Sequence, residues 1–192
     1  MIEPRMDQFN YLAVLISIIL GLGITQLLSG VGRLLQARGH VRLYWPTLAW
    51  VAVLLVLHVQ TWWAMFGLRT LQTWTFAAFL LVLLQPIVLF LLSALALPDP
   101  SSETADDLRA HYYSHTRWFF GLAAGLIVVS LTRDRVIAGH LPGSLNLSIQ
   151  ALLFVAWGMA ALTQRELYHR GLVALTSLLM LGYIGVLFGR LQ

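Results

Sequence analysis

The residue best placed to do chemistry in this sequence is His58, which lies near the middle of a long apolar stretch. The stretch covers residues 46–69 and reads PTLAWVAVLLVLHVQTWWAMFGLR. About 20 apolar residues in a helix cross the roughly 30 Å hydrocarbon core of a bilayer, so this stretch is long enough to span it. An ionisable side chain at that depth is costly and by default indicates a functional site. Gln60 stands two residues further on, and we expect it to belong to the same site.

A second polar side chain, Gln85, lies in the middle of the next apolar stretch, residues 74–97. It precedes Pro86, and because proline has no N–H to donate to the carbonyl of Val82, a kink is expected there. The amide falls at the same predicted depth as His58, so the two side chains define a candidate pore or substrate site. Further candidates in other apolar stretches are Gln26, Thr25 and Thr176.

The hydrophilic stretch 98–116 contains a pattern of metal-ligating side chains. If a helix forms there, Glu103, Asp107, His111 and His115 fall four residues apart on one face. Histidine and carboxylate side chains at this spacing are ligands of the right type for zinc. The polar face of a helix lying at the membrane interface explains the same pattern. His111, His115 and Asp107 are therefore candidate ligands, and the alternative stays open.

The composition predicts an all-α, polytopic integral membrane protein. Of the 192 residues 59% are hydrophobic and 10% are charged, whereas soluble domains have about 45–50% apolar and about 25% charged residues. The mean hydropathy is +0.79, and the apolar residues form long blocks that cannot share one soluble core. We predict one transmembrane domain over 1–192, a bundle of six helices. The predicted spans are 9–31, 46–69, 74–97, 117–132, 145–163 and 171–189, with a polar loop at 98–116.

The charged residues indicate how the chain meets the membrane. All 12 basic residues are arginines, and they gather at segment ends, which suits anionic lipid and favours the lipid bilayer as partner over nucleic acid. Six spans put both termini on one side. The loops on the opposite side carry seven arginines against five on the side of the termini, so the positive-inside rule predicts periplasmic termini. The exclusive use of arginine suggests a GC-rich bacterial genome, hence a bacterial inner membrane.

Small residues predict close helix packing. Residues 17, 21, 25 and 29 recur every four positions, and two Gly-x-x-x-Gly pairs occur at 121/125 and 185/189. Small residues at that spacing let another helix approach closely. The stripe on the first span is interpreted as a packing face or a pore-lining face, and the pattern favours a homo-oligomer.

Three functions from different classes fit these residues. The first is a homo-oligomeric channel or permeation protein in which His58 and Gln85 line or gate a narrow path. The second is a haem or zinc protein, with His58 as an axial haem ligand or His111 and His115 as zinc ligands. The third is an accessory or assembly subunit whose polar side chains only join helices. No enzyme motif is present and the sequence has no cysteine, so we expect neither catalysis nor a cofactor.

Overall fold

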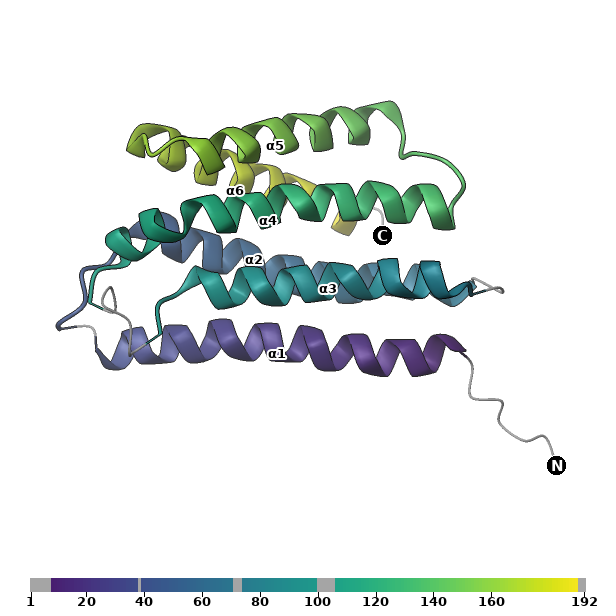
Figure 1. Cartoon of the computed structure of the whole chain (residues 1–192), viewed down its shortest axis with the longest axis horizontal. Helices are drawn as coiled ribbons and strands as arrows, with labels where there is room; N and C mark the ends of the chain where they lie inside the picture. Colours follow the sequence, from purple (N-terminus) through teal and green to yellow (C-terminus); the bar gives the residue numbers. More distant parts are fainter. Residues whose placement is uncertain (1–7, 38, 71–73, 100–105, 190–192) are drawn as a thin grey trace.

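The chain folds as a bundle of long helices that run along one axis (Figure 1). The computed structural model describes residues 8–37, 39–70, 74–99 and 106–189. In these residues the α-helices α1, α3 and α5 run in one direction and α2, α4 and α6 in the other. Five of them, all but α4, are long and apolar enough to cross a membrane. This confirms the predicted all-α membrane bundle. The elements are α1 (Gln8–Gln36), α2 (Trp45–Ala64), the 3-10 helix η1 (Met65–Thr70), α3 (Phe76–Ala96), α4 (Leu108–Ile137), α5 (Ser144–Leu162) and α6 (Glu166–Gly189).

Helix α4 begins inside the stretch that was predicted to be a polar loop. Asp107 caps it, because its Oδ1 accepts hydrogen bonds from the backbone N–H groups of Arg109 and Ala110 at 2.9 and 3.0 Å. The helix then continues to Ile137 and packs between α3 and α5. The polar connection before α4 is therefore shorter than the predicted 98–116, and the first turns of α4 carry the polar residues.

Helix α1 packs through a different set of small residues from the one predicted. A Cβ built on Gly23 would overlap the His58 ring, and one built on Gly30 would overlap the side chain of Leu97. These two glycines are buried, and they let α2 and α3 approach the backbone of α1. The predicted stripe faces outward instead, with all four of its members exposed: Ser17, Gly21, Thr25 and Ser29.

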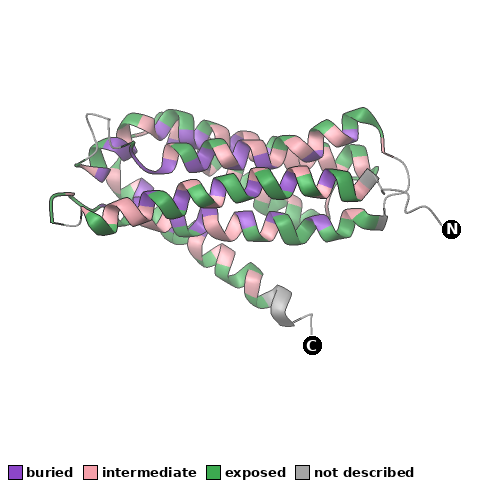
Figure 2. Ribbon diagram, turned by 90° about the horizontal axis from the view of Figure 1, so that it is seen from below, coloured by how far each residue is buried: buried purple, intermediate pink, exposed green. Residues whose placement is uncertain are grey.

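Helices α5 and α6 are joined by the short connection that the sequence predicted, but they separate after it. Helix α6 packs mainly against α2 rather than along α5. Figure 2 shows the C-terminal half of α6 projecting away from the other helices. Among its residues 166–185, the buried side chains all lie in the first half, where they are His169, Leu172, Val173 and Thr176. The predicted antiparallel hairpin is therefore an open one.

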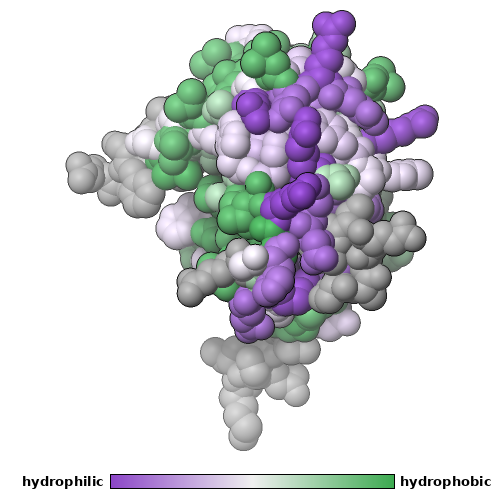
Figure 3. Space-filling view, turned by 90° about the vertical axis from the view of Figure 1, so that its left-hand side faces the viewer, coloured by the Kyte–Doolittle hydropathy of each residue, from purple (hydrophilic) through white to green (hydrophobic). Residues whose placement is uncertain are grey.

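Polar interactions tie helices together at the end of the bundle where α1, α3 and α5 finish. Hydrophilic side chains gather on this end (Figure 3). The backbone of Arg42 pairs with the segment before α4, since its carbonyl accepts from Leu108 N at 3.2 Å. Glu166 at the start of α6 bonds Arg109 of α4 at 2.7 Å and Arg170 at 2.6 Å. The start of α6 is thereby fixed to α4.

Candidate functional site

His58 is fully buried where α1, α2 and α3 meet. Its Nδ1–H donates to the carbonyl of Leu54 at 2.7 Å, so in the neutral ring Nε2 is an acceptor. Ser93 of α3 lies 3.5 Å from Nε2, but its hydroxyl donates to the carbonyl of Leu89 at 2.9 Å. The Nε2 edge of the ring also lies against Gly23 of α1. The predicted central histidine thus connects three helices.

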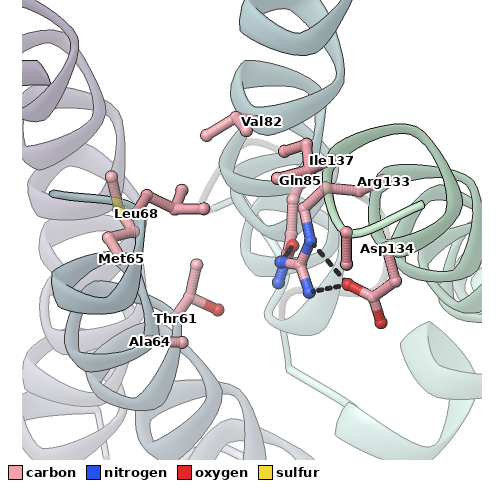
Figure 4. A pocket seen from close by; sticks show the side chains of 10 residues that line it. Thr61, Ala64, Met65, Leu68, Val82, Gln85, Arg133, Asp134 and Ile137 are labelled. Atoms are coloured by element: carbon pink, nitrogen blue, oxygen red, sulfur yellow. Dashed lines mark hydrogen bonds and ion pairs between the residues drawn. The ribbon is translucent and has the colours of Figure 1, made fainter. Parts of the chain in front are cut away.

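Gln85 belongs to a second polar group, with Arg133 and Asp134 of α4 (Figure 4). Nη1 of Arg133 donates to Oε1 of Gln85, while its Nε and Nη2 donate to Oδ1 of Asp134 at 3.1 and 2.8 Å. The side chains of Arg133 and Asp134 are only 23% and 27% exposed. An ion pair with this much of its surface buried is costly, because both charges lose part of their hydration.

These side chains line a cavity of about 190 Å³ that we call the vestibule. It is formed between α2 with η1, the first half of α3 and the end of α4. The vestibule is lined by Thr61, Ala64, Met65, Leu68, Val82, Gln85, Arg133, Asp134, Ile137 and Ala138. Since Pro86 provides no N–H, the carbonyl of Val82 also lacks its usual helical donor. The vestibule therefore combines apolar walls with several groups able to bind a polar guest.

His58 and Gln85 are not in contact, but both belong to a series of polar side chains inside the bundle, which we call the polar line: Arg133, Asp134, Gln85, Thr61, Ser93 and His58. Ser93, beside His58, follows Gln85 by eight residues, which is a rise of about 12 Å along α3. Thr61 lies one turn after His58 on the same face of α2, and it lines the vestibule. Polar side chains thus follow one another from the vestibule at Arg133 to the buried ring of His58.

The other predicted members of the polar site lie apart from this line or lack partners. Thr25 is exposed on α1 and donates to the carbonyl of Gly21 at 2.8 Å, and Gln26 is half-buried beside it. The buried Oε1 of Gln60 and the buried Oγ1 of Thr176 have no hydrogen-bond partner in the described residues. These four side chains do not form a common cluster with His58.

The predicted zinc ligands do not form a metal site in the part of the chain that the structure describes. No group of three or more His, Cys, Asp or Glu side chains there could hold a metal ion. Asp107 is used as the cap of α4, and Nε2–H of His111 donates to the carbonyl of Leu95 at 3.1 Å. Burial lowers the pKa of His111, which favours this neutral donor. His115 bonds the carbonyl of His111 and the hydroxyl of Ser114, and Glu103 lies outside the described residues.

The surroundings of His58 do not suit a haem ligand. An axial histidine needs a free ring nitrogen that faces an open slot for the porphyrin. Here Nδ1 is bonded to a carbonyl, and Nε2 faces Ser93 and the backbone at Gly23. Because the ring has no exposed surface, a porphyrin would require α1 and α3 to move apart.

Sequence reasoning missed a second buried histidine centre at the opposite end of the bundle. His169 is fully buried, its Nε2–H donates to the carbonyl of Thr163 at 2.9 Å, and its Nδ1 accepts from the hydroxyl of Tyr112 at 3.0 Å. Tyr44 and Tyr113 form a neighbouring pair, with their hydroxyls 3.1 Å apart. No sequence signal placed these residues together, because they come from α2, α4 and α6.

Three further residues that belong with these polar side chains, Ser93, Arg133 and Asp134, were also missed. Ser93 follows Gln85 by eight residues, which puts both on one helix face, so helical periodicity could have identified it. Arg133 and Asp134 stand near the end of α4, and only the packing of α4 on α3 reveals that Arg133 reaches Gln85.

No family model, no curated protein and no solved structure matches this chain. The functional argument therefore rests on the geometry of the bundle.

Proposed function

We propose that the protein is a membrane permeation protein, in which a small polar solute or ion enters the bundle through the vestibule and is controlled at the layer of His58. The observation that carries this proposal is the group formed by Gln85, Arg133 and Asp134, set inside an apolar bundle and open to a cavity of about 190 Å³. Charged side chains inside membrane bundles usually mark a substrate or ion pathway, because their burial is expensive.

The buried face of α2 extends this pathway toward the other end of the bundle. Its buried residues include Thr47, Trp50, His58 and Thr61, which recur at helical spacing among apolar neighbours. Leu54 interrupts the series directly before His58. We infer that the structure corresponds to a closed state, with the vestibule open toward one end and the path blocked where His58 meets α1 and α3.

The test is solute flux in proteoliposomes that contain the full chain. Gln85→Leu removes the amide that Arg133 contacts, and we expect flux to fall by about tenfold, the factor produced by about 1.4 kcal/mol of lost interaction. Gln150→Leu on α5 is the matched control, since Gln150 does not line the vestibule. Equal flux in the two variants, or no flux in wild type for any small ion tested, would contradict the proposal.

A second candidate, an accessory or assembly subunit, is favoured by the packing of α5 and α6. Helix α5 buries only Trp157 and Ala160, and residues 178–185 of α6 are largely exposed. A partner protein could cover these faces, as in a complex where this chain has no transport activity of its own. Co-purification of one stoichiometric partner, together with absence of flux from the isolated chain, would favour this function over permeation.

We further propose that copies of the chain associate in a bacterial inner membrane with periplasmic termini. The exposed small residues of α1 support the homo-oligomer, as do Gly121 and Gly125, whose Cβ positions meet open space. Arg42, Arg109 and Arg170 at the end seen in Figure 3 support a cytoplasmic location for that end. Crosslinking in membranes and labelling of single cysteines from each side test the two proposals.

A further inference from the structure

The acceptor nitrogen of His58 has no strong hydrogen bond in a fully buried position. Its Nδ1–H is committed to the carbonyl of Leu54 at 2.7 Å. In the part of the chain that the structure describes, the polar group facing Nε2 is the hydroxyl of Ser93 at 3.5 Å, and that hydroxyl donates to the carbonyl of Leu89 at 2.9 Å. The lone pair of Nε2 is therefore free to take a proton. A buried acceptor left this way costs free energy, and such groups call for a functional explanation.

The space around the ring excludes anything larger than a proton. His58 has no exposed surface, and a single Cβ added at Gly23 would already overlap Nε2. A hydrated ion or a polar solute cannot pass beside the ring in this arrangement, whereas the ring itself can carry a proton.

We infer that the permeant is the proton and that Nε2 of His58 binds it in transit; this inference rests on the permeation function proposed above. The proton comes from water in the vestibule, where Thr61 provides a hydroxyl one turn along α2 from the ring. An N–H bond forms at Nε2 as the Thr61 hydroxyl gives up its proton and takes another from protonated water in the vestibule, which is left as neutral water. The same bond breaks when the proton leaves toward the other end of the bundle, so no further reactant is needed.

Polar groups between Leu54 and the start of α2 can bind water, and that water can accept the proton when it leaves His58. A cavity of about 10 Å³ lies between Thr47, Trp50 and Tyr112, among other residues, and this is about the space of one water molecule. The buried Oγ1 of Thr47 has no hydrogen-bond partner in the described residues, so it can bind that water. The hydroxyl of Tyr112 continues to His169.

Among the described residues, no charged side chain is in contact with the His58 ring. Helix α1 presents Gly23 and α3 presents Ser93, neither of which titrates. The charged groups that face this interior from α4 are Arg133 and Asp134 of the vestibule, which are paired with each other. On α6, His169 is bonded to Tyr112 and Thr163 at the other end of the bundle. Loss of proton flux in a His58 variant can therefore be assigned to the ring.

The test uses proteoliposomes of the full chain with a potassium gradient, valinomycin and an internal pH dye. We expect wild type to take up protons, His58→Gln to lower that rate by about 100-fold, and the exposed-site control His140→Gln to leave it unchanged. Chloride and sodium flux, measured in parallel, should stay at the level of protein-free vesicles. Thermal unfolding establishes that each variant is folded, and the isosteric Thr61→Val replaces His58→Gln if the latter does not fold, with a lower proton rate expected.

The outcomes separate the inference from the function on which it rests. Undiminished proton uptake in His58→Gln, or in Thr61→Val where that variant is the one that folds, overturns the inference. Flux of chloride or sodium without flux of protons also overturns the proton inference, but it agrees with the proposed permeation function. Absence of every flux in wild type overturns both.

Discussion

The close contact between Gly23 and the ring of His58 provides the sharpest test of the packing described above. In Gly23→Ala, the new Cβ would overlap Nε2, so the ring, α1 or both must move. Gly21→Ala is the matched control, because it lies in the same helix two residues away and its Cβ would meet nothing within 4 Å. Both variants make the same chemical change, and only one of them meets an obstacle.

The expected difference in the free energy of unfolding follows from two effects. Alanine is favoured over glycine in a helix by about 0.5–1 kcal/mol, and this gain is common to both variants. Inserting an atom into a packed interior costs about 1–3 kcal/mol, and only Gly23→Ala bears this cost. We therefore expect Gly23→Ala to be less stable than Gly21→Ala by about 1–3 kcal/mol, or about 2–12 °C in Tm for a chain of this size.

The assay is thermal unfolding in mild detergent, followed by the fluorescence of the seven tryptophans. A double-mutant cycle with His58→Ala then isolates the contact, because the cost at position 23 should vanish when the ring is absent, giving a coupling of about 1–3 kcal/mol. Equal stability of the two alanine variants would refute the packing described for His58. If Gly23→Ala still lowered the stability in the His58→Ala background, the His58 ring would not be the group that the new Cβ meets.

Three further predictions concern polar groups, each measured by thermal unfolding. Asp134→Asn leaves Arg133 without its carboxylate in a mostly buried site, so we expect a loss of about 1–3 kcal/mol, between the values for exposed and fully buried pairs. Because the pKa of His111 is lowered in the folded state, the unfolded chain binds a proton first, and stability should fall as the pH drops below about 6.5; His111→Gln should weaken that dependence. Tyr112→Phe removes the donor to His169 and should cost about 1 kcal/mol, and an unchanged Tm would contradict the importance of that bond.

The sequence predicted the helices well because apolar length is a direct physical requirement for crossing a membrane. The span predicted at 46–69 compares with α2 and η1 over 45–70, and the one at 145–163 with α5 over 144–162. The start of α4 was missed because its first turns are polar, and polarity alone does not separate a loop from the exposed turn of a helix. Asp107, an aspartate of the kind that often caps the first turn of a helix, was the available signal for the start of α4.

The polar line could be predicted only in part, because hydropathy gives depth along a helix but not the direction a side chain faces. His58 and Gln85 were found from their depth, and the contact between Gln85 and Arg133 was not, since it depends on which helix lies beside α3. Residues 17, 21, 25 and 29 were interpreted as a packing face or a pore-lining face, and they are exposed, whereas Gly23 and Gly30 pack against α2 and the end of α3 within the chain. Two stripes of small residues occur on that helix, and only the neighbouring helices decide which one is buried.

Several buried polar atoms lack hydrogen-bond partners in the described residues, and the location of two groups of them bears on the choice between the proposed functions. Thr47 belongs to the interior face of α2, where water of a permeation path would satisfy it. Trp157 and Thr176 belong to α5 and α6, the helices with the least packing, where a partner chain would satisfy them. A permeation protein needs the first region to be hydrated, and an accessory subunit needs the second to be covered. The paired charges of the vestibule weigh toward the first, because burial of an ion pair is costly and charges inside membrane bundles usually mark a solute or ion pathway.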